Sequence, residues 1–178
     1  MLTEVLKALV HQPENLEVQF HEHTSTVLVQ ITAHPNDARI IVGQGRSHLS
    51  AVEVLARLLF HYERKLVQFM PVESWEDEPM LPQKKFVADP NWPEEKYRSL
   101  LTRLAQTCFK DAKVEVESRQ LNEITQRFTV KFDGRRPNDK PLMMFASAIA
   151  ILFVPVGSKS GRLIHADVEK QDANSRRQ

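Results

Sequence analysis

The residues best placed to do chemistry lie in one short stretch, residues 39–48. Gly43 and Gly45 permit a sharp backbone turn that exposes N–H groups, and Arg46 follows directly. An amphipathic pattern begins at His48, so the turn sits at the start of a helix. Exposed N–H groups and a nearby arginine at a helix start attract an anion, most often phosphate. The alternative is a glycine-rich turn that only joins two helices, because so short a motif is weak by itself.

The pattern on either side of the glycines indicates the elements that position them. Apolar residues at helical spacing predict a first helix within residues 1–11, which Pro13 ends. Alternating apolar residues predict two half-buried strands, from Leu16 to Phe20 and over 26–33, joined by a hairpin at 23–25. A long helix over 48–65 and a short strand over 65–70 follow. Ser50 and Glu53 have the spacing of a capping box, so this helix is expected to begin at Arg46 or one turn later.

This element order has a counterpart in a known family. Together with Pro35-x-Asp37 and the segment Ile40-Ile41-Val42-Gly43-Gln44-Gly45-Arg46-Ser47, it resembles a bacterial-type (type II) KH domain, and most of all the small bacterial single-KH RNA-binding proteins. The resemblance covers residues 2–70 and implies an α-β-β-α-α-β fold.

The resemblance also implies a ligand and a binding site. In KH domains a glycine loop grips the sugar-phosphate backbone of single-stranded RNA, and about four unpaired bases lie in an apolar groove. The residues expected to bind RNA are Arg39, Ile40, Ile41, Val42, Gly43, Gln44, Gly45, Arg46, Ser47 and His48. The groove would use Ile40, Ile41, Val42 and Leu49, with strand residues such as Val29 and Ile31.

The loop departs from the family pattern, which reads G-x-x-G and usually contains a basic residue. Here it reads G-Q-G, without a lysine. In one alignment Gly43 matches the first glycine and Gly45 arrives one residue early. In the other, Gly45 matches the second glycine and Val42 replaces the first.

The rest of the chain repeats the order of the beginning. Five of the ten prolines fall in residues 71–93, which predicts a proline-rich linker over 73–93. Trp75, Phe86 and Trp92 are expected to pack against a domain surface. Beyond the linker, apolar patterns predict a helix over 93–110, strands around 114–116 and 124–132, a helix over 138–153 and a strand over 162–168. This second half has no glycine pair before its long helix.

Composition restricts the class of protein. A net charge of +1 excludes a polycation, so a nucleic-acid site must be a local patch. The single cysteine, Cys108, excludes an internal disulfide framework and is expected to be a buried structural thiol. His21 and His23 are expected to face solvent rather than bind a metal. The uncharged run over 142–157 falls short of a membrane span and is expected to form a buried helix and the loop after it.

These observations give one interpretation and one competing hypothesis. The chain is expected to be an α+β protein with a KH-like domain over 1–72, a linker over 73–93, a second α-β-β-α-β domain over 94–170 and a disordered tail over 171–178. The second domain is either unrelated or a degenerate KH-like copy. The expected function is binding of single-stranded RNA in a bacterial cytoplasm, without enzymatic activity, cofactor, metal, small-molecule substrate or membrane contact. The competing hypothesis is a degenerate KH fold that acts as a protein-interaction or dimerisation module without RNA binding.

Overall fold

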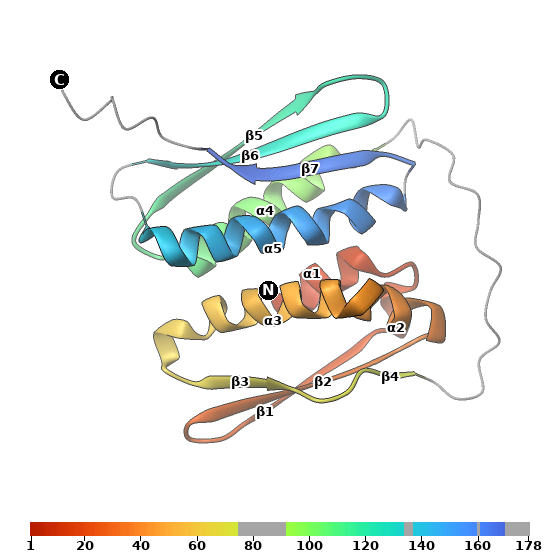
Figure 1. The fold of residues 1–178 in the computed structure, drawn as a ribbon, viewed down its shortest axis with the longest axis vertical. Helices are drawn as coiled ribbons and strands as arrows, with labels where there is room; N and C mark the ends of the chain where they lie inside the picture. Colours follow the sequence, from red (N-terminus) through yellow and green to blue (C-terminus); the bar gives the residue numbers. More distant parts are fainter. Residues whose placement is uncertain (75–91, 134–136, 160, 170–178) are drawn as a thin grey trace.

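The protein forms four layers, with two small sheets on the outside and helices between them (Figure 1). A computed structural model describes residues 1–74, 92–133, 137–159 and 161–169. The predicted α+β class is confirmed. Most of the expected linker and the expected tail, with Trp75 and Phe86, lie outside the described residues.

The first half contains the glycine stretch between two helices. Its helices are α1 (Leu2–Leu9), α2 (Pro35–Val42) and α3 (Ser47–Leu59), with short 3-10 turns at Pro13–Asn15, Gln44–Arg46 and His61–Glu63. Its strands are β1 (Glu17–Glu22), β2 (Thr26–Ala33), β3 (Leu66–Phe69) and β4 (Glu73–Ser74). Strand β2 is central and shows the predicted alternation, since Val27, Val29 and Ile31 are fully buried while their neighbours are not.

The second half contains α4 (Glu94–Cys108), β5 (Lys113–Gln120), β6 (Thr125–Asp133), α5 (Asp139–Ser158) and β7 (Leu163–Val168). The predicted order of helix, two strands, helix and strand is present. Both halves also share one sheet topology: β1 and β5 are antiparallel to the next strand, and β3 and β7 return parallel to it.

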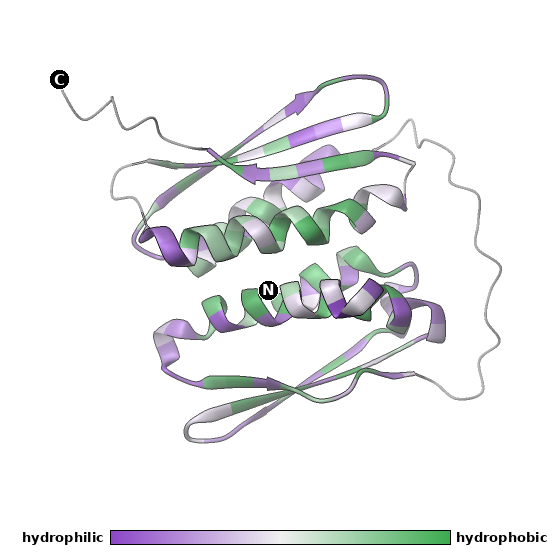
Figure 2. Ribbon diagram, viewed as in Figure 1, coloured by the Kyte–Doolittle hydropathy of each residue, from purple (hydrophilic) through white to green (hydrophobic). Residues whose placement is uncertain are grey.

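One continuous hydrophobic core joins the halves. The buried residues of both form a single cluster, and α3 packs against α5 in the middle of the molecule. The two helices run in opposite directions, so the start of α3 lies beside the end of α5 (Figure 1). The hydropathy colouring shows the apolar residues concentrated along these helices (Figure 2).

Helix α5 is long and apolar enough to cross a membrane by length and composition. Here it lies between β7 and α3 and buries one side against them. It therefore serves as the central helix of the shared core.

The long helix expected over 48–65 ends earlier, because α3 stops at Leu59 and residues 61–63 form a separate 3-10 turn. Four further local expectations differ from the structure. Phe20 is 37% exposed, because β1 is an edge strand with a neighbouring strand on one side only. Ser50 lies inside α3, which begins at Ser47, so Ser50 does not occupy the capping position. Residues 73–74 belong to no linker, since they form β4 and pair with the end of β2.

The fourth difference concerns α5, which continues through Pro155 to Ser158 instead of ending near Phe153. A proline inside a helix removes one N–H, which frees the carbonyl four residues earlier. That residue, Ile151, is 40% exposed, so water can reach this part of the helix.

Candidate nucleic-acid interface

The glycine stretch is a tight connection between α2 and α3. Gly43 follows α2 with φ 69° and ψ 171°, a conformation that is essentially restricted to glycine. Gly45 and Arg46 then both adopt left-handed conformations, with φ 57° and 65°. The backbone thus reverses over residues 43–46, here called the glycine loop, and α3 begins directly after it.

His48 fixes the loop from inside the first turn of α3. Its Nδ1 lies 2.6 Å from the carbonyl oxygen of Ile40, and because a carbonyl only accepts, Nδ1 carries the hydrogen. The ring packs so closely on Gly43 that a Cβ atom there would lie 2.6 Å from His48 Cγ. The loop is therefore held in one shape, and Gly43 is required for that shape.

The tip of the loop is open to solvent and presents unbonded donors. Gln44, Gly45 and Arg46 are exposed, and nothing lies within 4 Å of the place where a Cβ of Gly45 would be. Within the described part of the chain, the backbone N–H groups of Gln44 and Gly45 make no hydrogen bond. No described side chain caps the start of α3, and its first turn contains no acidic residue. These N–H groups favour an anion at the loop.

Two of the predicted binding residues supply positive charge. Arg39 is exposed on α2, and Arg46 is exposed at the loop with its Nη2 3.5 Å from Glu53 Oε1. An exposed ion pair of this length is weak, so the Arg46 guanidinium can exchange its carboxylate partner for a phosphate.

The structure divides the remaining predicted residues into core and rim. Ile41 is fully buried, and Ile40, Val42, Ser47 and His48 are half-buried. Leu49 is 3% exposed. Val29 and Ile31 are fully buried under the helices. Ile41, Leu49 and the two strand residues thus hold the helices on the sheet, and of the expected apolar groove only Ile40 and Val42 reach the surface.

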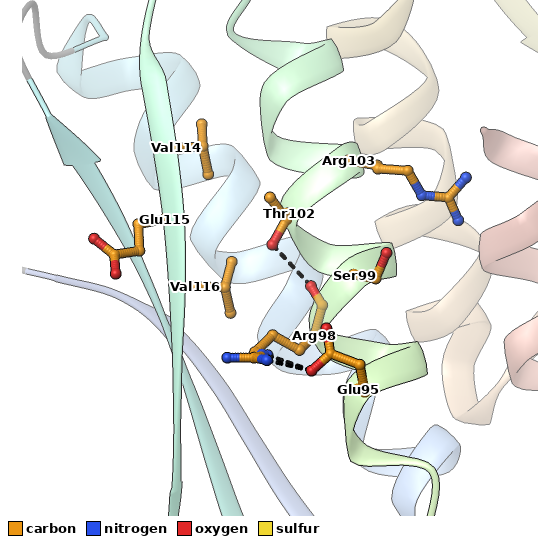
Figure 3. Close-up of a pocket in the computed structure, with 8 residues that line it drawn as sticks. All are labelled: Glu95, Arg98, Ser99, Thr102, Arg103, Val114, Glu115 and Val116. Carbon is orange, nitrogen blue, oxygen red and sulfur yellow. Dashed lines mark hydrogen bonds and ion pairs between the residues drawn. The ribbon is translucent and has the colours of Figure 1, made fainter.

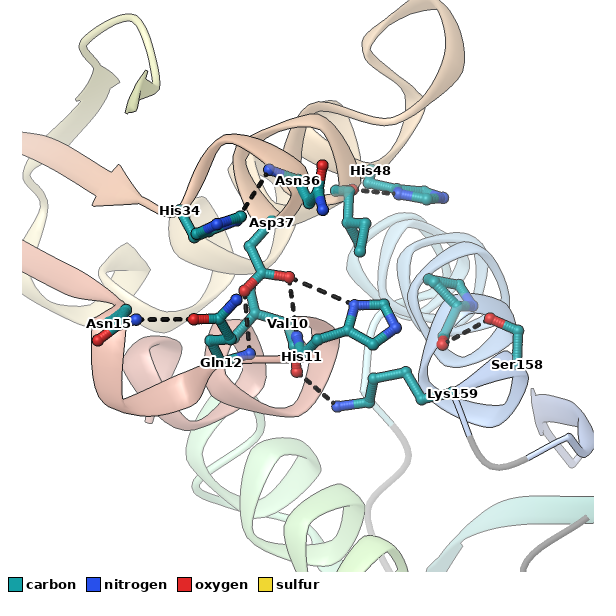
Figure 4. A network of polar contacts seen from close by, with 12 residues as sticks. Val10, His11, Gln12, Asn15, His34, Asn36, Asp37, His48, Ser158 and Lys159 are labelled. Carbon is teal, nitrogen blue, oxygen red and sulfur yellow. Dashed lines mark hydrogen bonds and ion pairs between the residues drawn. The ribbon is translucent and has the colours of Figure 1, made fainter. Parts of the chain in front are cut away.

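A buried carboxylate holds the start of α2, a role that the sequence did not reveal. Asp37 is 1% exposed, and its two oxygens accept the backbone N–H groups of His11 and Gln12 at 2.8 and 3.0 Å (Figure 4). The His11 ring lies 3.3 Å from the same carboxylate. The chain after α1 is thereby fixed to α2. Asp37 stood out in the sequence only as part of Pro35-x-Asp37, because its partners lie about 25 residues earlier.

A lysine from the second half enters this network. Lys159, directly after α5, donates from Nζ to the carbonyl oxygen of Val10 at 2.9 Å (Figure 4). Burial, helped by the positive charge of Lys96 and opposed by Asp37, lowers the pKa of the Lys159 ammonium from 10.5 to about 8. Among the described residues no carboxylate forms an ion pair with Lys159.

A hollow of about 360 Å³ lies between α4 and β5 (Figure 3). Its two arginines are already paired, Arg98 with Glu95 and Arg103 with Glu4 at 2.7 Å between Nη2 and Oε2. Both ion pairs are shorter than the Arg46–Glu53 pair, so a phosphate would have to displace a closer carboxylate here than at the glycine loop.

Other residues singled out in the sequence have structural surroundings. Cys108 is buried, as predicted, and burial raises the pKa of its thiol from 9.0 to about 12. His21 and His23 are exposed, also as predicted, and the described residues contain no cluster of three potential metal ligands. Trp92 stacks on Tyr97 with ring centroids 4.6 Å apart, so its predicted packing role is confirmed.

Comparison with protein-family models and with curated proteins finds no match to this chain.

Proposed function

We propose that the chain binds single-stranded RNA, with the glycine loop on the sugar-phosphate backbone. The observation that carries the proposal is the loop itself. It is a tight turn at the start of a helix, its tip is exposed, the N–H groups of Gln44 and Gly45 make no hydrogen bond to the described residues, and Arg39 and Arg46 lie on either side. Backbone donors and guanidinium groups together suit a phosphodiester better than a neutral ligand.

The arrangement of the first half supports the resemblance to a type II KH domain. Its elements follow the α-β-β-α-α-β order, and the loop joins the two helices that lie between β2 and β3. In that family the same connection meets RNA. Here Ile40 and Val42 form the apolar rim available to a base, so phosphate contacts contribute more to affinity than base contacts do.

The proposal is tested with a fluorescently labelled pool of random single-stranded RNA, by anisotropy at several salt concentrations. The double variant Arg39→Gln/Arg46→Gln is compared with the wild type. If each arginine holds one phosphate, the slope of log affinity against log salt should fall in magnitude by about 0.7 per arginine removed.

Arg57→Gln is the matched control, since Arg57 is exposed on α3 away from the loop and carries the same charge. It should bind RNA like the wild type. Absence of binding by the wild type at about 50 mM salt, where phosphate contacts are strongest, would refute the proposal. Equal losses of affinity in the double variant and the control would show that only overall charge matters.

A second candidate function is supported by α5. Met143, Ile151 and Val154 are 69%, 40% and 46% exposed, and their spacing places them along one side of the helix. An apolar stripe of this kind favours the competing hypothesis of a module that pairs with a second copy of the chain. Analytical ultracentrifugation of the wild type and of the double variant Met143→Lys/Val154→Lys tests this self-association. A wild-type dimer that becomes a monomer in the variant supports it. A wild type that stays monomeric at high concentration excludes it.

A further inference from the structure

Lys159 has a position that the proposed RNA path can reach. The end of α5 lies beside the start of α3, where the glycine loop is (Figure 1). Lys159 donates to the carbonyl oxygen of Val10, and the next residue, His11, donates its backbone N–H to Asp37 in the first turn of α2. Asp37 precedes Gly43 by six residues, which is about 9 Å along a helix. Three nucleotide steps of about 3.4 Å each cover about 10 Å, so a strand held at the loop can span the part of α2 that separates the loop from Asp37 and the network that includes Lys159.

The electrostatics at Lys159 favour an added anion. Its ammonium has three N–H donors, and the structure shows one bond, to Val10. Lys96 is exposed in the first turn of α4, next to Tyr97, whose ring stacks on Trp92. The Arg162 guanidinium lies over the same Trp92 ring, so the start of α4 lies beside the chain that follows α5. The positive charge of Lys96 disfavours protonation of Lys159. A phosphate between the two ammonium groups would remove this repulsion and accept the remaining donors.

From this juxtaposition we propose that Lys159 and Lys96 form a second phosphate subsite, through which the second half of the chain holds the same RNA strand as the glycine loop. The inference rests on the proposed function and adds a role for the second half, whose sequence has no glycine pair before its long helix. The ligand is a phosphodiester about three nucleotides away from the one at the loop.

A purely structural role for Lys159 makes a different prediction. Val10 is the C-cap residue that follows α1, and a lysine that donates to the carbonyls at the end of a helix stabilises the helix. Such a cap needs no contribution from Lys96, and it does not respond to RNA. The two roles are therefore separable by experiment.

The first measurement is the salt dependence of affinity for a short labelled oligouridylate. In Lys159→Gln and in Lys96→Gln the slope of log affinity against log salt should fall in magnitude by about 0.7, as expected when one phosphate of a single strand is no longer neutralised. Lys159→Arg keeps the charge and should retain the wild-type slope. Lys140→Gln, at the opposite end of α5, is the matched control and should leave the slope unchanged. Thermal denaturation checks that each variant is folded, and Lys96→Gln, at an exposed site, decides the question should Lys159→Gln unfold.

The second measurement follows the Lys159 ammonium directly, by NMR titration of protein labelled with ¹³C at lysine Cε. The oligouridylate should raise the pKa of Lys159 from about 8 toward its ordinary value of 10.5. This inference would be overturned if the oligouridylate left the pKa of Lys159 unchanged and if Lys159→Gln and Lys96→Gln both kept the wild-type salt slope. The proposed function would remain intact if binding still depended on Arg39 and Arg46. A wild type that binds no oligouridylate would overturn both.

Discussion

Replacing each glycine of the loop by alanine should have very different effects on stability. Gly43→Ala places a side chain in a conformation that is restricted to glycine, which costs about 1–3 kcal/mol. Its Cβ would also lie 2.6 Å from His48 Cγ and 2.9 Å from His48 backbone N. The ring can move but the backbone nitrogen cannot, so overpacking adds about 1–3 kcal/mol.

Gly45→Ala meets no such obstruction. Its φ of 57° is left-handed, at a cost of about 1–2 kcal/mol, and no atom lies within 4 Å of the added Cβ. Part of that cost is offset, by about 0.4–1 kcal/mol, because alanine restricts the unfolded chain. The net expectation is a decrease in the free energy of unfolding of about 1 kcal/mol for Gly45→Ala, against about 4 kcal/mol for Gly43→Ala.

Calorimetry on the two purified variants measures the difference. With about 2–4 °C per kcal/mol for a chain of this size, Tm should fall by about 8–16 °C for Gly43→Ala and by about 2–4 °C for Gly45→Ala. Equal shifts, or a larger one for Gly45→Ala, would refute the description of His48 as packed against Gly43. If the folded Gly45→Ala variant still binds RNA, the loop needs only Gly43. If it does not bind, the loop needs both glycines.

Three further predictions concern the rest of the fold. Asp37→Ala leaves two backbone N–H groups without their acceptor and should lower the free energy of unfolding, measured by urea denaturation, by about 2–4 kcal/mol. The control Asp111→Ala removes an exposed carboxylate and should change that free energy by less than about 0.5 kcal/mol. Equal effects of the two substitutions would contradict the buried network around Asp37. The Cys108 thiol ionises near pH 9 in the unfolded chain, whereas in the folded protein its pKa is raised to about 12 and it stays protonated. Its contribution to stability is therefore complete below pH 9 and is lost as the pH rises toward 12. Cys108→Ala should remove that component of the pH dependence, and rapid alkylation of the folded protein at pH 8 would disprove its burial. Gly157→Ala would place a Cβ 2.7 Å from the backbone oxygen of Arg162, between α5 and β7, and should lower Tm by several degrees. An unchanged Tm would show that these two elements are loosely packed.

Local patterns predicted most of the elements because burial follows them directly. The alternation through Val27, Val29 and Ile31 specified β2, and the apolar stripe from Leu49 to Leu55 specified the side of α3 that packs. The order of the second half followed from the same periodicities. The end of α5 could not be predicted in this way, because Pro155 is a local signal to stop and the surrounding core keeps the helix intact.

The candidate site was predictable at its centre and hidden at its edges. Gly43, Gly45 and Arg46 are neighbours in the chain, so their turn was visible in the sequence. The bond between Lys159 and Val10 joins residues 149 positions apart, and no pattern in the sequence indicates it. The expected apolar groove was too large for a related reason. An isoleucine or leucine suits a ligand groove and a protein core equally well, so the sequence cannot tell which role Ile41 and Leu49 have. Only the packed structure shows that both are buried.

The packing of α3 against α5 makes this chain an intramolecular counterpart of a symmetric dimer. Two units of one sheet topology meet through antiparallel helices, as two copies do across a two-fold axis. The covalent connection then acts chiefly by raising the effective concentration of one half for the other. A single cut within residues 75–91 should therefore leave two fragments that remain associated, and the fragments expressed separately should find each other. Among the described residues only the first unit carries a glycine loop, so the two halves of this pseudo-symmetric pair are not equivalent as binding sites.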